Sequence, residues 1–373
     1  MPKLKTQTLV SLKQKLERDV LIGSDRDNLA PSTVAIYVRQ LLKLFKSGLD
    51  EYSWSHDEFI DRIHYPRMFD DTKFQNEFKV QNSDMISLLR SVYKSKETLI
   101  LTLNALCKMT KNRFKQTFDY YNRVRKELSK QNKSEKLDNE LTPEEEAKYI
   151  SYDELMAIPV KVKSDIIRQY GNLLISKGDF DVLHKSKRND YLLFLFEYIT
   201  LYLNVHYPLR LVWPTVRLEP VEGENYLQGN NLYLNDFKNV RLMGPQVIDI
   251  DSSTMQLIKQ YLQFLTDPLG QTLAKLLWRV YNGRAGEYDY TSNKTGGFSQ
   301  MLSRIFVKYN KKLMSMNTIR NIVESNLIQS PQYSTMTNRA KNDLHAKLLH
   351  SSYAANISYN KISNRSKDAP LDF

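Results

Sequence analysis

Hydrophobic residues recur every three or four positions along most of this 373-residue chain, and this spacing limits the fold more than any other feature. The run that follows Pro31 is an example, with apolar residues at Val34, Tyr37, Val38, Leu41, Leu42 and Phe45. Residues at this spacing lie on one face of a helix and pack against a core, while Arg39, Lys43 and Lys46 lie on the other face. The sequence therefore predicts a mainly α-helical fold.

One long polar and charge-dense stretch, centred on residues 130–136, interrupts this pattern. Such a composition is typical of a solvated linker or a helix extension, and we place a linker at residues 129–149. Residues 1–29 then form a basic N-terminal arm, and residues 30–128 form an all-helical domain with helices expected at 83–93, 96–109 and 112–128. Residues 150–373 form a second domain with a short C-terminal tail.

The second domain mixes the helical period with short β-rich runs. Residues 190–204 are apolar on nearly all sides, which predicts a buried helix, and further helices are expected at 253–266, 297–309, 316–325 and 337–349. Two strands are expected at 231–235 and 246–250, around a loop that contains Lys238 and Gly244. We therefore predict an α+β domain that is mainly helical and contains a small antiparallel β-sheet.

The charge balance indicates a polyanionic partner. The chain has 54 Lys and Arg against 42 Asp and Glu, a formal net charge of +12. A basic protein without a nucleic-acid partner has the same composition, so charge alone leaves both alternatives open. The 23 tyrosines, many of them beside basic residues, suit contacts with phosphate and sugar.

Several classes of protein are excluded by composition. Cys107 is the only cysteine and lies in an apolar run, which excludes disulfide scaffolds and thiolate zinc sites and predicts a buried thiol. The histidines form no compact metal signature, because the spacing of His345 and His350 is poor for two ligands on one helix face. No apolar run is long enough to span a membrane, and the first residues lack the apolar core of a secretory signal.

Five residues of the second domain form a candidate catalytic set around a tyrosine. Arg210 follows the predicted buried helix, Lys238 lies between the two strands, and Arg320 lies in a helical run. His350 and Tyr359 follow in a segment otherwise rich in small and apolar residues, where a short turn between two helices would bring their rings together. Deprotonating a phenol at pH 7 costs about 4 kcal/mol, because its pKa is near 10. A tyrosine nucleophile therefore needs cations and donors around it.

In this order and in these contexts, the five residues resemble the catalytic set of the tyrosine recombinase (integrase) family. The resemblance covers about residues 150–360, and the segment from His350 to Tyr359 is its most specific part. The helical domain before it is similar, less specifically, to the core-binding domain of that family. The resemblance implies a two-domain clamp around duplex DNA. The many Asn, Lys, Tyr and Ile residues indicate an AT-rich genome, such as that of a large DNA virus or a mobile element. The resemblance also implies site-specific cleavage and rejoining of DNA through a 3′-phosphotyrosyl intermediate.

The resemblance implies a role for each residue. Tyr359 attacks a DNA phosphodiester, and Arg210 and Arg320 bind the non-bridging oxygens through paired donors that keep their protons. Each fixed donor contributes about 3 kcal/mol in the transition state. His350 adds a further donor, and Lys238 protonates the leaving 5′-oxygen as a general acid, with Arg241 nearby as a substitute. The phosphotyrosyl link preserves the energy of the bond, so we expect no metal or nucleotide cofactor.

Two residues depart from the family pattern. Asn317 lies where the family usually has a histidine three residues before the second arginine. An amide can position the tyrosine or the phosphate but cannot act as a base, so we expect slower chemistry, and faster cleavage in an Asn317→His variant. Leu349 replaces the usual glycine before His350, which changes the geometry of the helix end.

Double-stranded DNA is the expected partner, bound by a homo-tetramer that is a monomer or dimer when free, with the tail after Tyr359 docking on a neighbour. Residues expected to contact phosphates, or else to form solvated faces, are Arg39, Lys43, Lys46, Arg241, Lys308, Lys311, Lys312, Arg339 and Lys341. Such a protein would be intracellular and located with its DNA, in a nucleus, a viral factory or a prokaryotic cytoplasm.

Two other functions fit the same residues. A type IB topoisomerase, which uses a similar nucleophile and cations, would relax supercoiled DNA as a monomer. A catalytically degenerate recombinase would bind DNA without cleaving it, and Asn317 favours this alternative. Tyr353 is a second tyrosine close to His350, and we expect it to serve only in packing.

Overall fold

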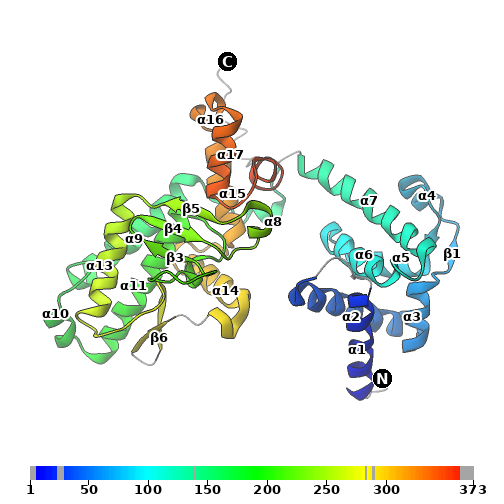
Figure 1. The fold of residues 1–373 in the computed structure, drawn as a ribbon, viewed down its shortest axis with the longest axis horizontal. Helices are drawn as coiled ribbons and strands as arrows, with labels where there is room; N and C mark the ends of the chain where they lie inside the picture. Colours follow the sequence, from blue (N-terminus) through cyan, green and yellow to red (C-terminus); the bar gives the residue numbers. More distant parts are fainter. Residues whose placement is uncertain (1–5, 23–28, 138–139, 282–283, 288–289, 362–373) are drawn as a thin grey trace. The chain divides into compact units, whose positions relative to one another are not determined.

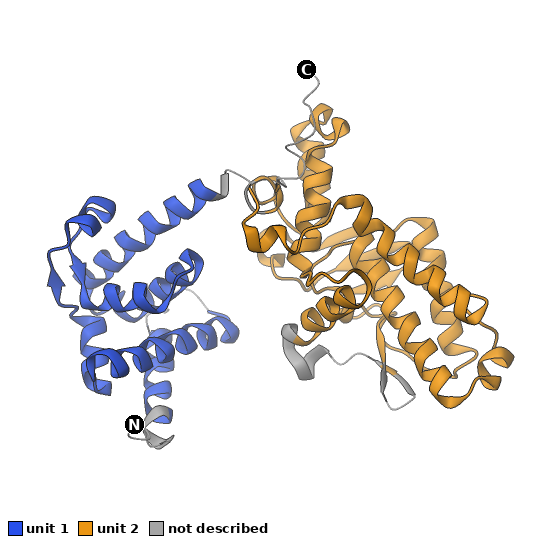
Figure 2. Ribbon diagram, turned by 180° about the vertical axis from the view of Figure 1, so that it is seen from behind, with its two compact units in different colours: residues 1–138 blue, residues 139–373 orange. Residues whose placement is uncertain are grey.

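The computed structural model describes residues 6–22, 29–137, 140–281, 284–287 and 290–361 (Figure 1). The chain divides into two compact units, Met1–Asp138 and Asn139–Phe373 (Figure 2). Parts of the predicted N-terminal arm, and the predicted docking tail beyond residue 361, lie outside the described residues.

Unit 1 is built almost entirely of helices. These are α1 (Thr6–Ile22), α2 (Pro31–Tyr52), α3 (His56–His64), α4 (Thr72–Phe78), α5 (Asp84–Val92), α6 (Lys96–Thr110) and α7 (Lys115–Leu137). Two short strands, β1 (Met68–Phe69) and β2 (Asn82–Ser83), pair antiparallel. The unit has its own core, which includes the fully buried side chains of Leu16, Leu41, Phe59 and Leu106.

Helix α2 confirms the pattern from which a helix was predicted. Pro31 occupies its first position, and Ser53 ends it in a left-handed conformation with φ 57°. Its buried face consists of Val34, Tyr37, Val38, Leu41, Leu44, Phe45 and Gly48. A Cβ at Gly48 would lie 2.7 Å from the Trp54 ring, so this close approach requires a glycine. Arg39, Lys43 and Lys46 are exposed, as predicted.

Helix α7 runs further than the sequence predicted. We expected a helix over 112–128 and a linker from 129, but α7 continues to Leu137. The polar residues of this extension are good helix formers, and Glu135 forms an ion pair with Lys96 of α6. The charge-dense stretch is therefore helical over its first part. It is followed by the short capped helix α8 (Pro143–Glu146).

In its described part, unit 2 consists of helices around a three-stranded and a two-stranded sheet. Its helices are α9 (Tyr152–Tyr170), α10 (Lys177–Val182), α11 (Lys185–His206), η1 (Trp213–Thr215), α12 (Val240–Met243), α13 (Ser252–Thr266), α14 (Tyr290–Asn310), α15 (Met316–Ile328), α16 (Pro331–Thr335), α17 (Asn338–Lys347), α18 (Ser352–Ala354) and the π-helical turn η2 (Ala355–Tyr359). Its strands are β3 (Tyr226–Gln228), β4 (Asn231–Leu234), β5 (Gln246–Asp249), β6 (Trp278–Tyr281) and β7 (Arg284–Glu287).

The centre of unit 2 is α11, which is buried on most sides, as predicted. It packs against α9, α14, α15 and β6. The three-stranded sheet is antiparallel with the order β3-β4-β5, and β4 and β5 are the two strands that the sequence predicted. Leu232 of β4 pairs with Ile248 of β5, and both face the core. The prediction of a mainly helical protein with a small antiparallel sheet is confirmed. No helix among the described residues is long and apolar enough to cross a lipid bilayer.

Candidate active site around Tyr359

Helix α15 supplies two buried charged residues to the site. Ser315 caps its N-terminus by accepting from the backbone N–H of Thr318, and Ile319 and Ile322 anchor its apolar face in the core. Arg320 and Glu324 lie one turn apart on this helix, and each is only 1% exposed. Burial of two ionised groups is costly unless both have partners, so their contacts define the site.

The chain after α17 turns sharply and places His350 in the same region. Helix α17 ends at Lys347, and Leu349 adopts a left-handed conformation with φ 62°. The side-chain amide of Asn239, from the β4–β5 connection, donates to the carbonyl of Leu349 at 3.2 Å. A glycine would adopt this conformation without strain, whereas Leu349 holds it with a buried side chain.

Tyr359 is the last residue of the π-helical turn η2, an element often found at functional sites. The Ser325 hydroxyl of α15 donates to the Tyr359 carbonyl at 3.1 Å and accepts from the Lys361 N–H at 2.7 Å. This double contact fixes the backbone of Tyr359 against α15. The side chain of Tyr359 is buried, whereas that of Tyr353 is 65% exposed.

The phenol of Tyr359 meets cationic groups from two other segments. Arg210, which follows α11 and has φ 61°, donates from Nη2 to the Tyr359 hydroxyl at 2.8 Å. The Arg320 guanidinium carbon lies 4.9 Å from the centre of the Tyr359 ring. The ring of His350 stacks on Tyr359 with 4.7 Å between ring centres and 24° between planes. The phenol is thus held by one guanidinium, faced by a second and covered by an imidazole.

The guanidinium of Arg320 also ties the local backbone together. Its Nη1 donates to the Pro208 carbonyl at 2.5 Å, and its Nη2 donates to the Leu348 carbonyl at 2.6 Å. Nη2 also contacts Nδ1 of His350. Burial lowers the pKa of Arg320, while the nearby Tyr359 opposes this shift. An arginine remains charged even so, and it therefore places a fixed positive charge beside the phenol.

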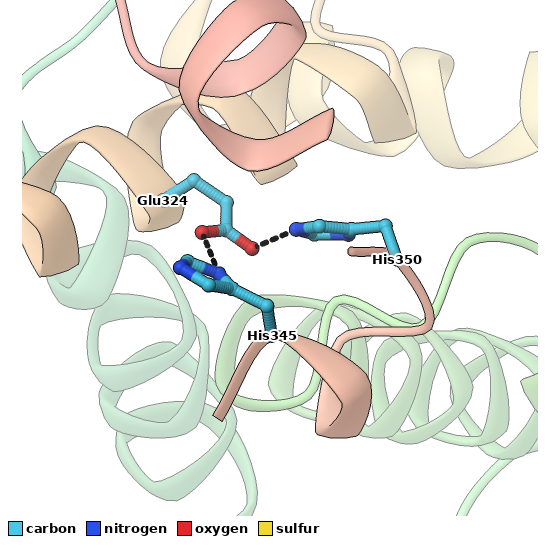
Figure 3. Close-up of side chains that lie close together, drawn as sticks. All are labelled: Glu324, His345 and His350. Atoms are coloured by element: carbon cyan, nitrogen blue, oxygen red, sulfur yellow. Dashed lines mark ion pairs between the residues drawn. The ribbon is translucent and has the colours of Figure 1, made fainter. Parts of the chain in front are cut away.

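Glu324 lies between two histidines (Figure 3). Its Oε1 is 2.5 Å from Nε2 of His350, and its Oε2 is 3.1 Å from Nδ1 of His345. Burial raises the pKa of Glu324, but the contacts with the two imidazoles outweigh burial and lower the pKa to about 2. Burial lowers the pKa of His350, and Glu324 opposes that shift. A carboxylate flanked by two imidazoles is the result.

The structure brings together several of the residues that the sequence singled out, namely Arg210, Arg320, His350 and Tyr359. Lys238 is exposed, one residue before Asn239, and no contact of its amine with these residues is seen in the described part of the chain. Arg241, its expected substitute, is also exposed, on the short helix α12. The role of Lys238 as the general acid therefore stays a prediction.

Asn317 lies in the first turn of α15 but is exposed. It lines a cavity of about 510 Å³ together with Tyr149, Arg304 and Ser315. Among the described residues, none of the predicted catalytic side chains hydrogen bonds to Asn317. Its amide does not position Tyr359 in this conformation.

The basic residues expected to contact DNA differ in their surroundings. In unit 2, Lys308 forms an ion pair with Glu197 at 2.6 Å, Lys312 donates to the Ala147 carbonyl at 2.8 Å, and Lys341 lies 4.8 Å from the centre of the Tyr333 ring. Lys311 and Arg339 are exposed. In unit 1, Lys43 lies 4.9 Å from the Tyr93 ring centre while remaining exposed. DNA contacts by these residues remain predictions.

Sequence reasoning missed three residues next to the site, namely Glu324, His345 and Tyr333. The Tyr333 hydroxyl lies 2.8 Å from Nε2 of His345. The spacing of His345 and His350 is poor for two ligands on one helix face, but α17 ends between them, and the turn that follows brings both to Glu324. The spacing of Glu324, four residues after Arg320 on a predicted helix, was the available signal.

The arrangement can stabilise negative charge beside a nucleophilic oxygen. The Tyr359 hydroxyl has a fixed cationic donor in Arg210, and Arg320 supplies a second positive charge within a few ångströms. Comparison of the chain with protein-family models, with curated proteins and with solved structures finds no match.

Proposed function

We propose that this protein is a tyrosine-type DNA strand transferase, a site-specific recombinase that cleaves and rejoins DNA with Tyr359 as nucleophile. One observation carries the proposal: Arg210 donates to the Tyr359 hydroxyl at 2.8 Å. These residues are far apart in sequence, and a buried packing tyrosine needs no arginine on its oxygen. The contact places a guanidinium where charge develops when the phenol attacks a phosphodiester.

The reaction requires the phenol to transfer its proton to a water molecule and the phosphorus to gain a fifth oxygen. Arg210 stabilises the phenolate and one non-bridging oxygen, and the positive charge of Arg320 lies over the Tyr359 ring. The 5′-oxygen leaves with a proton, for which Lys238 is the proposed donor. The 3′-phosphotyrosyl bond then reacts with a 5′-hydroxyl of another strand, which reverses the first step.

The remaining parts of the proposal concern assembly. Unit 1 is the proposed DNA-binding partner of the catalytic unit, with the basic face of α2 directed at phosphates. The two units would clamp duplex DNA, and a tetramer would join two sites. This arrangement follows from the resemblance to tyrosine recombinases and from the net charge of +12.

Covalent trapping on DNA tests the reaction. Nicked duplexes of randomised sequence, which lose the leaving strand after cleavage, would accumulate a protein–DNA adduct that survives denaturation. We expect an adduct with the wild-type protein and with Tyr353→Phe, and none with Tyr359→Phe. Tyr353 is the matched control because it is a neighbouring tyrosine with an exposed side chain. An adduct that persists in Tyr359→Phe would reject the proposal.

The main rival is a DNA-binding protein that has lost catalysis. The exposed position of Asn317 and the engagement of Arg320 with two backbone carbonyls favour it. Tight binding to DNA without any adduct would support this rival. Relaxation of supercoiled plasmid without recombinant products would instead support a type IB topoisomerase.

A further inference from the structure

A continuous series of buried polar contacts leads away from the candidate active site. It runs from the hydroxyl of Tyr333 to His345, then to Glu324, to His350 and to Arg320. His345 and His350 are 0% and 2% exposed, and Glu324 is 1% exposed. The residues come from α15, α16, α17 and the turn that follows α17. Glu324 and His345 were not expected from the resemblance.

The chemistry of the end groups fixes the position of each proton. Nδ1 of His350 contacts both Nη2 of Arg320, which only donates, and the Leu348 carbonyl at 3.0 Å, which only accepts. Because Nη2 of Arg320 already donates to that carbonyl at 2.6 Å, we assign Nδ1 as an acceptor from Arg320, and the proton of a neutral imidazole then lies on Nε2. Nε2 lies 2.5 Å from Oε1 of Glu324, which can only accept. The same carboxylate favours a proton on Nδ1 of His345, and Nε2 of His345 shares a hydrogen bond with the hydroxyl of Tyr333.

We propose that Glu324 is the positioning residue of the site, because its two oxygens hold Nδ1 of His345 and Nε2 of His350. His350 in turn fixes the guanidinium of Arg320 and the stacked ring of Tyr359. This inference rests on the proposed function and changes the role that the resemblance implies for His350. Both ring nitrogens of His350 are engaged by the protein, so His350 orients Arg320 and Tyr359 instead of donating to the phosphate.

A metal ion bound by the same three side chains is the alternative. Two ligand atoms at about 2.0–2.1 Å from a tetrahedral zinc ion are separated by about 3.3 Å. Oε1 of Glu324 and Nε2 of His350 are only 2.5 Å apart, which suits a shared proton. The guanidinium of Arg320 contacts the other nitrogen of His350, and its charge opposes a nearby cation.

Nitrogen-15 NMR of histidine-labelled full-length protein tests the proton positions, with signals assigned by replacing each histidine in turn. In the wild-type protein we expect His345 protonated on Nδ1 and His350 protonated on Nε2. In Glu324→Gln, the amide offers one acceptor and one donor group, so one of the two imidazoles must change its tautomer. Glu324→Asp keeps two acceptors and should keep both tautomers.

Glu197→Gln is the matched control for this spectrum. Glu197 is a buried carboxylate of the same unit and contacts Lys308 at 2.6 Å and the Tyr309 hydroxyl at 2.5 Å. We expect this variant to leave the signals of His345 and His350 unchanged. A wild-type spectrum with His350 protonated on Nδ1, or one mole of tightly bound metal per chain, would overturn the inference.

The rate of adduct formation supplies a second readout. We expect Glu324→Gln to bind DNA with unchanged affinity and to form the adduct at least tenfold more slowly, with partial recovery in Glu324→Asp. An unchanged rate in Glu324→Gln would overturn the positioning role. A wild-type protein that has the expected tautomers but forms no adduct supports the assignment of Glu324 and rejects the proposed reaction instead.

Discussion

At the scale of single residues, Arg210 and Leu349 show how backbone strain is stabilised at the site. Arg210 and Leu349 both have left-handed backbone conformations, with φ 61° and φ 62°. Such a conformation costs a non-glycine residue about 1–2 kcal/mol, and it persists only when the surroundings stabilise it. The hydrogen bond to Tyr359 stabilises the conformation of Arg210, and the burial of its side chain stabilises that of Leu349.

The Leu349→Gly variant tests whether backbone strain or side-chain burial has the larger effect on stability at this position. It relieves about 1–2 kcal/mol of backbone strain but removes a buried side chain that contributes about 2–5 kcal/mol. We therefore expect the free energy of unfolding of unit 2 to fall by about 1–3 kcal/mol, measured by denaturant titration. Lys311→Gly is the control, because Lys311 has φ 64° and is exposed, so its replacement should stabilise by about 1 kcal/mol. A more stable Leu349→Gly would contradict the burial argument.

Glu324 makes stability depend on pH. Its pKa in the folded protein is lowered to about 2, whereas an unfolded glutamate titrates near 4.3. The unfolded state therefore binds this proton first, and stability is lost as the pH falls from about 5 toward 2. The lowered pKa of His350 acts in the same direction below about pH 6.5.

We expect the free energy of unfolding of Glu324→Gln to depend less on pH than that of the wild-type protein between about pH 5 and pH 3. The variant lacks the carboxylate whose protonation is linked to unfolding. Urea unfolding monitored by circular dichroism at a series of pH values measures the two slopes. Equal slopes would show that Glu324 does not carry this linkage.

At the scale of elements, the sequence predicted those helices and strands whose pattern is set locally. Helix α2, with its apolar stripe and Pro31, and the strands β4 and β5 are examples. The extension of α7 was missed because a charge-dense run is typical of both linkers and exposed helices. The meeting of His345, His350 and Glu324 was missed because it depends on where α17 ends and on the turn at Leu349.

The exposed face of α2 carries a prediction of its own. Replacing Arg39, Lys43 and Lys46 with Gln should weaken DNA binding and reduce the slope of log K against log salt by about 0.9 per lost contact, up to about 3. Fluorescence anisotropy at several salt concentrations measures this slope. Replacing Arg67, Lys73 and Lys79, which are exposed elsewhere in unit 1, removes equal charge. An equal effect of both triple variants would reject a specific role for α2.

At the scale of the whole molecule, the chain consists of two units with separate hydrophobic cores. Separate cores predict two unfolding transitions, each sensitive to its own core. Leu106→Ala in unit 1 and Ile319→Ala in unit 2 each remove a fully buried side chain and should cost about 2–5 kcal/mol. In scanning calorimetry each variant should lower the midpoint of one transition only. A single transition lowered by both variants would show that the units unfold together.

The most direct measurement of the central claim is mass spectrometry of the protein after reaction with a cleavable DNA duplex and digestion. The proposed chemistry predicts a nucleotide 3′-phosphate linked to the peptide that contains Tyr359, and to no other residue. A nucleotide on Tyr353 or elsewhere, or unmodified Tyr359 in protein that binds the duplex tightly, would contradict it.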